Sequence, residues 1–527
     1  MNKKIKELIE NNPDLADYIS AIKNENIDIK NENLAIKKEI VNLEKQNESL
    51  RFTLSKMNKS VFGTKSEKTK QKEVEHIEDF NEAEANKNLN ALEPTIEKVI
   101  KVRKTKTSRK EQFKNLEVEK TVYDLTESEK VCDVCGSKMV EIGSTTRETI
   151  KVLRKAIKVI EESITYKCPH CGAFKKNMPK NLPITNGIAD SSLLAQVIVD
   201  KTANGLPLYR QSQDYKSIGL SLSRQTLSNW MMKSADLLEI IYKHMKKILI
   251  SSDIIHADET TVQVLRETGK KASQKSYMWV YVSSVMFKQI CLYEYQSSRH
   301  GTNAKQFLSG FKGYLNVDGY KGYNQVENVT LVLCMAHLRR KFNDVYVLLP
   351  KEQQENSNTA TAMSYCNRIY SLDNTSKELS VAVRHEFKQE KIKPLMQEFD
   401  QWLKEKEKTC ADSSGYGKAI KYASFHLPKV MNYLEDGRLE IDNNRAERAV
   451  KPFVIGRKNW LFSNTPEGAE SSAILYSIVQ TCLLNQINPY SYLTEVLDIL
   501  ANKNVNELNL DSIMPFTEEI IKKHKMS

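Results

Sequence analysis

Three acidic segments, far apart along the chain, most constrain how these 527 residues can fold. They are IIHADETT at 254–261, YLNVDGYKGYN at 314–324 and IDNNRAERAVKPF at 441–453. Asp258 and Asp318 each follow a short apolar run that is typical of a buried strand. Glu447 lies between the capping residues at 442–444 and Pro452, which predicts a short helix that ends at the proline. We therefore expect an α/β core in which strand ends and a helix meet.

Three carboxylates that converge in this way are what a two-metal enzyme acting on phosphodiesters needs. Two cations about 3.5–4 Å apart stabilise the attacking and the leaving oxygen of an in-line displacement. Magnesium prefers hard oxygen ligands, with one or two carboxylates for each ion. We predict Asp258, Asp318 and Glu447 as catalytic residues that bind Mg²⁺ or Mn²⁺.

Each of these acidic residues also has a simpler explanation. Asp258 could cap a turn, Asp318 lies in a tight DGY turn, and Glu447 could pair with Lys451 four residues on. Glu259 directly follows Asp258, but neighbours on a strand point to opposite faces, so only one of them should reach the site. We choose Asp258 and keep Glu259 as the alternative.

The charge and the cysteine pattern restrict the compartment and the partners. A net charge of +12 and a pI of about 8.9 fit a polyanionic partner such as nucleic acid, although a merely basic soluble protein would look the same. Of the nine cysteines, four form two close pairs, which favours a reduced protein with a metal site over a disulfide framework. The first residues are too polar for a signal peptide, and the apolar stretch at 473–484 is too short to span a bilayer. We expect a cytoplasmic, nucleoid-associated bacterial protein that does not bind a membrane.

A heptad repeat runs through the region 1–64. One heptad position is always apolar, with Ile22, Ile29, Ile36, Leu43, Leu50 and Met57. The second position on the same helix face mixes apolar residues with Asn26, Asn33 and Asn47. Asparagine at such a position trades stability for register and oligomeric state. This pattern predicts a coiled coil that forms a homodimer or a higher oligomer; the alternative is one amphipathic helix that packs on a core.

The next two regions are expected to be a linker and a zinc ribbon. The stretch 65–118 is charged and poor in apolar residues, so it cannot bury a core; its basic end could contact DNA or remain solvated. In 119–182, two C-x-x-C pairs flank strand-like residues and predict one structural Zn²⁺ site, held by Cys132, Cys135, Cys168 and Cys171. His170 is a possible substitute ligand, and a redox pair is the weaker alternative.

Residues 183–248 predict two helices joined by a turn that contains glycine. Ser223 is a candidate N-cap of the second helix, whose apolar face contains Leu227 and Trp230. The opposite face carries side chains of the kind that contact bases or phosphates in a major groove, namely Arg224, Gln225 and Asn229. Many helical hairpins have this pattern without binding DNA.

The remaining chain predicts a split α/β core. In 249–350 the pattern indicates three strands ending near residue 295, a helix at 303–311, the strand before Asp318, a strand at 331–337 and a helix. This order is consistent with a ribonuclease H-like fold. We expect a helical insertion at 351–438, the second part of the core at 439–485 with a buried helix, and a short amphipathic tail at 486–527.

Several long motifs resemble the insertion sequence 66 family of transposases. They are HADETTVQVL, GYLNVDGYKGYN, CMAHLRRKF and LEIDNNRAERAVKPFVIGRKNWLFSNTPEGAE, and LPLYRQ, SRQTLSNW and FGTKSEK resemble further parts of that family. The resemblance implies a DDE transposase that binds terminal inverted repeats and target DNA, with two small accessory proteins of the same element as partners. It also implies Asp258, Asp318 and Glu447 as the metal ligands.

The resemblance leaves several assignments open. Cys334 and His337 match a C-x-x-H feature of many such enzymes, but a packed strand end explains them equally well. Candidate phosphate contacts are Arg339, Arg340, Arg457 and Lys458, each of which could be a solvated charge. Two rival functions remain: a zinc-dependent dimeric DNA-binding regulator, and a nuclease that acts on branched DNA.

Overall fold

The computed structural model describes residues 155–169, 171, 173–504 and 507–526, together with Lys130, Ser137 and scattered positions between 24 and 43. The predicted linker, Cys132, Cys135 and His170 lie outside the described residues. The described positions of the heptad region are helical, and the side chains of Ile29, Ile36 and Leu43 are about half exposed. No helix in the described part of the chain is long and apolar enough to cross a membrane.

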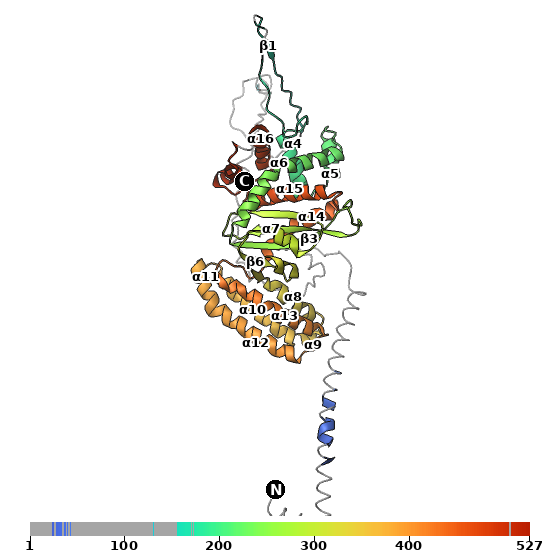
Figure 1. Cartoon of the computed structure of the whole chain (residues 1–527), viewed down its shortest axis with the longest axis vertical. Coiled ribbons are helices and arrows are strands. Elements are labelled where there is room, and N and C mark those ends of the chain that lie inside the picture. The colour runs from blue at the N-terminus through green and yellow to red at the C-terminus, as the bar shows by residue number, and fades with distance from the viewer. Residues whose placement is uncertain are drawn as a thin grey trace, which may run out of the picture.

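A β-hairpin comes first and projects from the body at the top of Figure 1. Its strands are β1 (Thr165–Lys167) and β2 (Phe174–Lys176), which pair antiparallel. Cys168 and Cys171 lie in the connection, where the Cys168 amide donates to the Ala173 carbonyl at 2.7 Å. The strand-like pattern before the hairpin is not matched at 155–164, which has no regular secondary structure.

Three helices follow the hairpin, one more than the two predicted from the sequence. They are α4 (Ser191–Thr202), which precedes the predicted pair, α5 (Leu208–Ser217) and α6 (Arg224–Ile250). Gly219, with φ of +85°, makes the turn between α5 and α6, and the Ser223 side chain caps α6 by accepting from the Thr226 amide. The cap prediction is therefore confirmed. The helix α6 continues as far as Ile250, because Ile241, Met245 and Leu249 extend the buried face that begins with Leu227 and Trp230.

The centre of the molecule is a five-stranded mixed sheet with the strand order β5-β4-β3-β6-β7. The strands are β3 (Ile254–Gln263), β4 (Lys275–Ser283), β5 (Cys291–Gln296), β6 (Gly313–Val317) and β7 (Val329–Leu333). β3, β4 and β5 form an antiparallel meander, and β6 and β7 run parallel to β3. The predicted order of strands, with α7 (Gly301–Phe307) before β6, is confirmed.

Helices cover both faces of this sheet. On one face, α14 (Asn444–Trp460) and α15 (Pro466–Leu484) pack Phe453 and Tyr476 against a set of β-strand residues that includes Val280. On the other face, Phe307 of α7 stacks on Tyr281 with ring centroids 3.9 Å apart, and Lys246 of α6 lies over the same Phe307 ring. The alternating side chains of β4 are therefore buried on both sides.

Polar residues of α15 satisfy the backbone of the edge strand β5. The Tyr293 amide donates to the Ser477 hydroxyl at 2.8 Å, and the Cys291 amide donates to the Thr481 hydroxyl at 3.1 Å. Thr481 in turn donates to the Cys291 carbonyl at 3.0 Å. This explains why a predicted buried helix is interrupted by hydroxyl side chains, since they cover a sheet edge that would otherwise be open.

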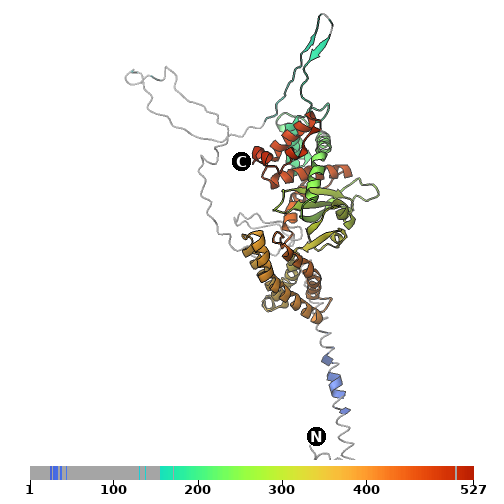
Figure 2. The same cartoon turned by 60° about the vertical axis from the view of Figure 1, so that its left-hand side comes forward.

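Helices also form the segment between β7 and the third acidic residue. After α8 (Met335–Tyr346) come α9 (Lys351–Gln354), α10 (Asn358–Ser376), α11 (Val381–Phe387), α12 (Lys393–Thr409) and α13 (Gly415–Met431). A π-helical turn, Lys388–Ile392, joins α11 to α12, and a 3-10 turn, Asn432–Glu435, follows α13. In Figures 1 and 2 these helices lie on the opposite side of the sheet from α4 and α5.

A C-terminal helix packs onto the first helix after the hairpin. α16 (Pro489–Asn502) lies against α4, and α17 (Glu518–His524) follows. A single cluster of buried apolar residues extends from Ile184 to Ile520 and includes residues of the sheet and of the helices on both sides of it.

Two predicted element ends are wrong. The strand predicted at 331–337 stops at Leu333, because the Met335 amide bonds to the Ile441 carbonyl and α8 begins there. The helix that carries Glu447 does not stop at Pro452 but continues to Trp460. Packing of Phe453 and Val454 against the sheet offsets the hydrogen bond that Pro452 cannot donate.

Candidate active site

Asp258 and Asp318 lie level with one another on neighbouring parallel strands. The register pairs His256 of β3 with Asn316 of β6, so two residues further along Asp258 comes beside Asp318. Asp318 directly follows β6, where its carboxylate accepts from the Tyr320 amide at 2.8 Å. Asp258 accepts from the Glu259 amide at 2.8 Å. The two aspartates thus lie just beyond the end of the pairing between β3 and β6, with Asp258 inside β3 rather than at the strand end expected from the sequence.

The face on which each side chain lies separates Asp258 from Glu259. Asp258 pairs with Val280 of β4, which belongs to the cluster that contacts α14 and α15. Glu259 pairs with Trp279, whose ring packs edge-on against Tyr323 on the opposite face. Since directly paired residues share a face, Asp258 points to the side that carries α14 and Glu259 points away from it.

Glu259 is occupied by partners of its own. Its side chain is 1% exposed, and it accepts hydrogen bonds from Arg299 at 2.7 Å and from the Tyr323 hydroxyl at 2.6 Å. The Arg299 guanidinium also lies 4.1 Å from the centre of the Tyr320 ring. This buried ion pair holds the loop after β6, which carries Asp318, against β3.

Glu447 lies in the first turn of α14, and the segment before that helix is bonded to both strands of the site. Asn443 donates from its side-chain amide to the Ala257 carbonyl at 2.8 Å, and its side-chain oxygen lies 3.3 Å from Nδ1 of His256. Asn316 of β6 donates to the Glu440 carbonyl at 3.1 Å. These bonds orient the start of α14 relative to Asp258 and Asp318.

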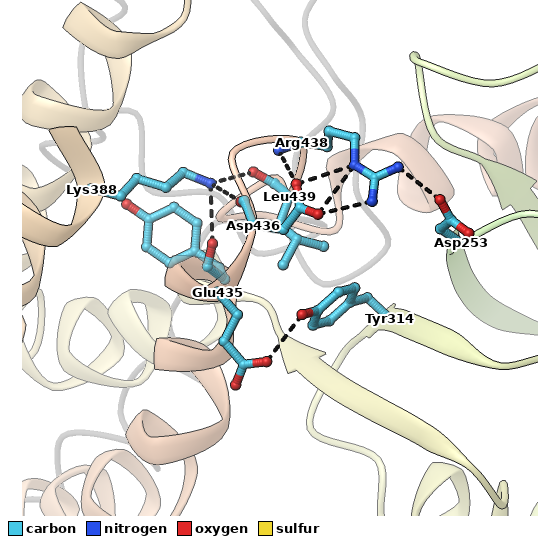
Figure 3. Close-up of polar contacts among 8 residues, drawn as sticks. Asp253, Tyr314, Lys388, Glu435, Asp436, Arg438 and Leu439 are labelled. Carbon is cyan, nitrogen blue, oxygen red and sulfur yellow. Dashed lines mark hydrogen bonds and ion pairs between the residues drawn. The ribbon is translucent and has the colours of Figure 1, made fainter. Parts of the chain in front are cut away.

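A buried lysine holds the loop that leads into this segment. Lys388 is fully buried in the π-helical turn, and its ammonium group donates to three backbone carbonyls at 2.8–3.0 Å, those of Tyr433, Asp436 and Leu439. Figure 3 shows the three bonds converging on its Nζ atom. Burial lowers the pKa of Lys388 to about 7. The lysine therefore fastens the end of the helical segment to the entry of α14.

An arginine on the same loop bonds to the start of β3. Arg438 donates to Asp436 at 2.9 Å and to Asp253 at 2.8 Å, as Figure 3 shows. The Tyr314 hydroxyl of β6 donates to Glu435 at 3.1 Å. The loop is thus attached to both parallel strands at the end opposite to the aspartates.

The pKa of Asp258 responds to the charges of the other two predicted acidic residues. Burial raises the pKa of Asp258 well above its ordinary value, and the negative charges of Glu259, Asp318 and Glu447 raise it further. Three carboxylates with this mutual repulsion form the oxygen-rich donor set that divalent cations prefer. The residues present therefore fit a site for Mg²⁺ or Mn²⁺.

A second group of candidate ligands surrounds Glu447. Cys334, His337 and Glu447 each offer one ligand atom, and these three atoms lie within 4.8 Å of one another. Within the described residues, the ligand atoms of Asp258, Asp318 and Glu447 do not lie this close together. His337 Nδ1 is 3.7 Å from Glu447 Oε1. Burial, followed by Arg340, lowers the pKa of His337 to about 4, so the imidazole is neutral at pH 7. Burial likewise raises the pKa of Cys334 well above its ordinary value, and the thiol accepts from the Asn443 amide at 3.2 Å.

The predicted basic contacts fall into two groups. Arg339 is 5% exposed and donates to Asn367 at 3.0 Å, and Arg457 donates to the hydroxyls of Thr260 and Thr261, so both bond within the protein. Arg340 is half-buried beside His337, and Lys458 is exposed near the end of α14. Arg224, Gln225 and Asn229 are exposed on α6, where Gln225 donates to Asn229 at 3.0 Å.

Sequence reasoning missed two groups near the site. Arg299 and Tyr323 surround Glu259, and Lys341 of α8 is exposed and lowers the pKa of His337. The motif YKGYN contains Tyr323, so its repeated aromatic residues were the available signal. Arg299 has no comparable sequence signal, since its role depends on how α7 packs beside β3.

Comparisons with known proteins identify the family of the chain. The model of the family described as "Transposase IS66 family" matches residues 186–471, which is more than half of the chain and includes all three acidic residues. An uncharacterized protein of Sinorhizobium fredii, y4qI, is 29% identical over 416 residues, 75% of each chain. A second one, y4jD, is 28% identical over 405 residues, 73% of this chain and 78% of the relative. The chain belongs to the IS66 family of transposases.

Proposed function

We propose that this transposase cuts DNA at the terminal inverted repeats of its insertion sequence and joins the cut ends to target DNA. The observation that carries the proposal is the convergence of three elements: the β3–β6 register brings Asp258 beside Asp318, and Asn443 bonds the start of α14, which carries Glu447, to β3. Divalent cations bound there would stabilise the attacking and the leaving oxygen of each phosphoryl transfer. Ligands that surround two ions are spaced more widely than ligands of one ion, which suits the spacing of these carboxylates.

The two steps use one geometry. In cleavage, the oxygen of water attacks phosphorus, the bond to the 3′ oxygen breaks, and that oxygen takes a proton to become a 3′ hydroxyl. In strand transfer, this hydroxyl loses its proton and attacks a phosphorus of the target, whose own 3′ oxygen leaves. Asp258 and Asp318 fix the position of the site on the sheet, while the bonds of Asn443 hold Glu447 against them.

The fold supports the same proposal. A meander of three antiparallel strands, extended on one side by two parallel strands, is the arrangement we expect of a ribonuclease H-like core. The acidic residues lie on its central strand, after its next parallel strand and on a helix of one face. The helices from α9 to α13 are then the expected insertion into this core, and α8 belongs to its first part.

The regions outside the core supply binding in this proposal. Arg224, Gln225 and Asn229 of α6 contact the terminal repeat, and Arg340 and Lys458 contact phosphates. Cys132, Cys135, Cys168 and Cys171 bind a structural Zn²⁺. The half-exposed Ile29, Ile36 and Leu43 pair two copies through a coiled coil, and two accessory proteins of the element complete the complex.

A strand-cleavage assay tests the proposal. The substrate is a labelled duplex that contains the inverted repeat flanking the reading frame, incubated with Mg²⁺. We expect cleavage by the full chain, loss of cleavage by at least about a hundredfold in Asp258→Asn, Asp318→Asn and Glu447→Gln, and retained binding of the duplex.

Glu327→Gln is the matched control, because Glu327 is an exposed carboxylate whose partner is Lys305. Binding without cleavage by the unaltered chain would favour a zinc-dependent regulator. Cleavage of branched DNA regardless of end sequence would favour a repair nuclease instead.

A further inference from the structure

Three aromatic rings form a stack on the side of α13 that faces the candidate site. Tyr422 and His426, one helical turn apart, stack with centroids 4.0 Å apart and planes 18° from parallel. Phe425 packs edge-on against His426 at 5.0 Å. The Nδ1 atom of His426 lies 2.8 Å from the Tyr422 carbonyl, which fixes the orientation of the imidazole. The outermost ring, Phe425, is 65% exposed.

The inner end of the stack touches the residue that follows Asp318. A Cβ atom on Gly319 would collide with the Tyr422 hydroxyl and lie 3.0 Å from Nε2 of His426. Burial raises the pKa of Tyr422 to about 12, and the charge of Asp318 contributes to this rise. The rings therefore run from the backbone beside a predicted catalytic aspartate outward to solvent.

Basic side chains from α8 and α13 lie near the stack. Lys341 of α8 lies 5.2 Å from the centre of the Tyr422 ring, and the charge of Arg340 acts on the Tyr422 hydroxyl. Lys429, one turn after Phe425, donates to Asn324 at 2.6 Å in the segment after Asp318. An exposed ring between basic side chains is the combination that binds nucleic acid strands, because bases stack on the ring and phosphates pair with the cations.

We propose that Tyr422, Phe425 and His426 form a stacking platform for one unpaired nucleobase of the DNA strand next to the scissile phosphate. The proposal rests on the proposed function, since it takes the DNA strand to reach Asp318. In this proposal the duplex opens near its cut end, so that one base is unpaired when its strand reaches Asp318. Stacking of the freed base on Phe425 offsets part of the cost of unpairing it.

A comparison of binding to two matched DNA duplexes tests the platform and does not require cleavage. The probe is the terminal-repeat duplex with a three-nucleotide single-stranded overhang, compared with the same duplex whose overhang consists of abasic sites. Both overhangs carry the same phosphates, so their difference reports stacking alone. The proteins are full-length chains that carry Asp258→Asn, and affinity is measured by fluorescence anisotropy at fixed salt.

We expect the overhang with bases to bind about tenfold tighter than the abasic one. Phe425→Ala should remove this preference and leave binding of the blunt duplex unchanged, while Phe425→Trp should restore it. Val383→Ala, which shortens a side chain on α11 that is 47% exposed, should keep the full preference.

Equal binding of both overhangs by the parent chain, or an unchanged preference in Phe425→Ala, would overturn the platform. So would a change in oligomeric mass in Phe425→Ala with the preference intact, because the ring would then contact another protein copy. Cleavage of the blunt duplex by the chain with Asp258 restored is measured in parallel. Its absence would count against the proposed function. Equal binding of both overhangs by the parent chain, with cleavage intact, would count against the platform alone.

Discussion

At the scale of single residues, the alternation of side chains along a strand determines which acidic residue of β3 faces α14. This alternation allowed the sequence to separate Asp258 from Glu259, and the pairing of these residues with Val280 and Trp279 places them on opposite faces. The partner of Glu259 could not be predicted in the same way. Arg299 is 40 positions away, and only the packing of α7 and the loop after β6 brings it to the carboxylate.

The repulsion among the carboxylates predicts that neutralising Asp258 stabilises the protein when divalent cations are chelated. At pH 7.5 we expect Asp258→Asn to raise the melting temperature by about 2–4 °C. The pKa of Asp258 is raised on folding, so its ionisation disfavours the folded state as pH rises above the ordinary value. The gain should therefore shrink as the pH falls toward the ordinary value of 3.8, and it should vanish below that value, where the carboxyl is protonated in both states.

Thermal melts followed by circular dichroism check this sign, with and without Mg²⁺. Adding Mg²⁺ should stabilise the parent chain more than Asp258→Asn, because the proposed ion would bind the folded state through this carboxylate. Glu327→Gln should respond to Mg²⁺ as the parent chain does. A variant that melts below the parent chain in chelator would show that the carboxylates do not repel one another.

At the scale of elements, local signals predicted which helices and strands exist better than where they end. The N-cap at Ser223 is a local hydrogen bond and was predicted, whereas β7 ends because Met335 bonds to a carbonyl 106 positions later. Pro452 is a strong local stop signal, yet α14 passes through it because Phe453 is anchored on the sheet. Element ends that depend on distant partners leave no mark in a short window of sequence.

The Lys388 bonds predict an unusual pH dependence of stability. Lys388→Met should lower the melting temperature because three buried carbonyls lose their donor. The pKa of Lys388 is about 7 in the folded state, so between pH 7 and 10 the unfolded chain binds more protons at this position. The parent chain should therefore gain stability with rising pH, by up to roughly 1 kcal/mol per unit, relative to the variant.

Urea unfolding at pH 7, 8 and 9 measures this difference. Lys404→Met is the matched control, because Lys404 is an exposed lysine of the neighbouring α12 that pairs with Asp400. If the free energies of unfolding of the parent chain and Lys388→Met differ by the same amount at all three pH values, the buried ammonium group keeps its ordinary pKa.

At the scale of the whole molecule, the sheet and the helices that cover it lie between two groups of helices (Figure 1). One group contains α4, α5 and α16, and the other contains α8 to α13. The sequence predicted the order of these parts, because order follows from patterns along the chain. It did not predict that their cores join, with buried residues from Ile184 to Ile520 in one cluster. Periodicity shows that a face is buried but not which distant face covers it. The packing of α16 on α4 is an example.

Crystals of the full chain grown with Mn²⁺ and a cleaved terminal-repeat duplex give the most direct measurement, since anomalous scattering locates the ions without assumptions about ligands. The account predicts two manganese ions about 3.5–4 Å apart, bound by Asp258, Asp318 and Glu447 beside the DNA end. Manganese held only by Cys334 and His337, or no ion on the two aspartates, would contradict it.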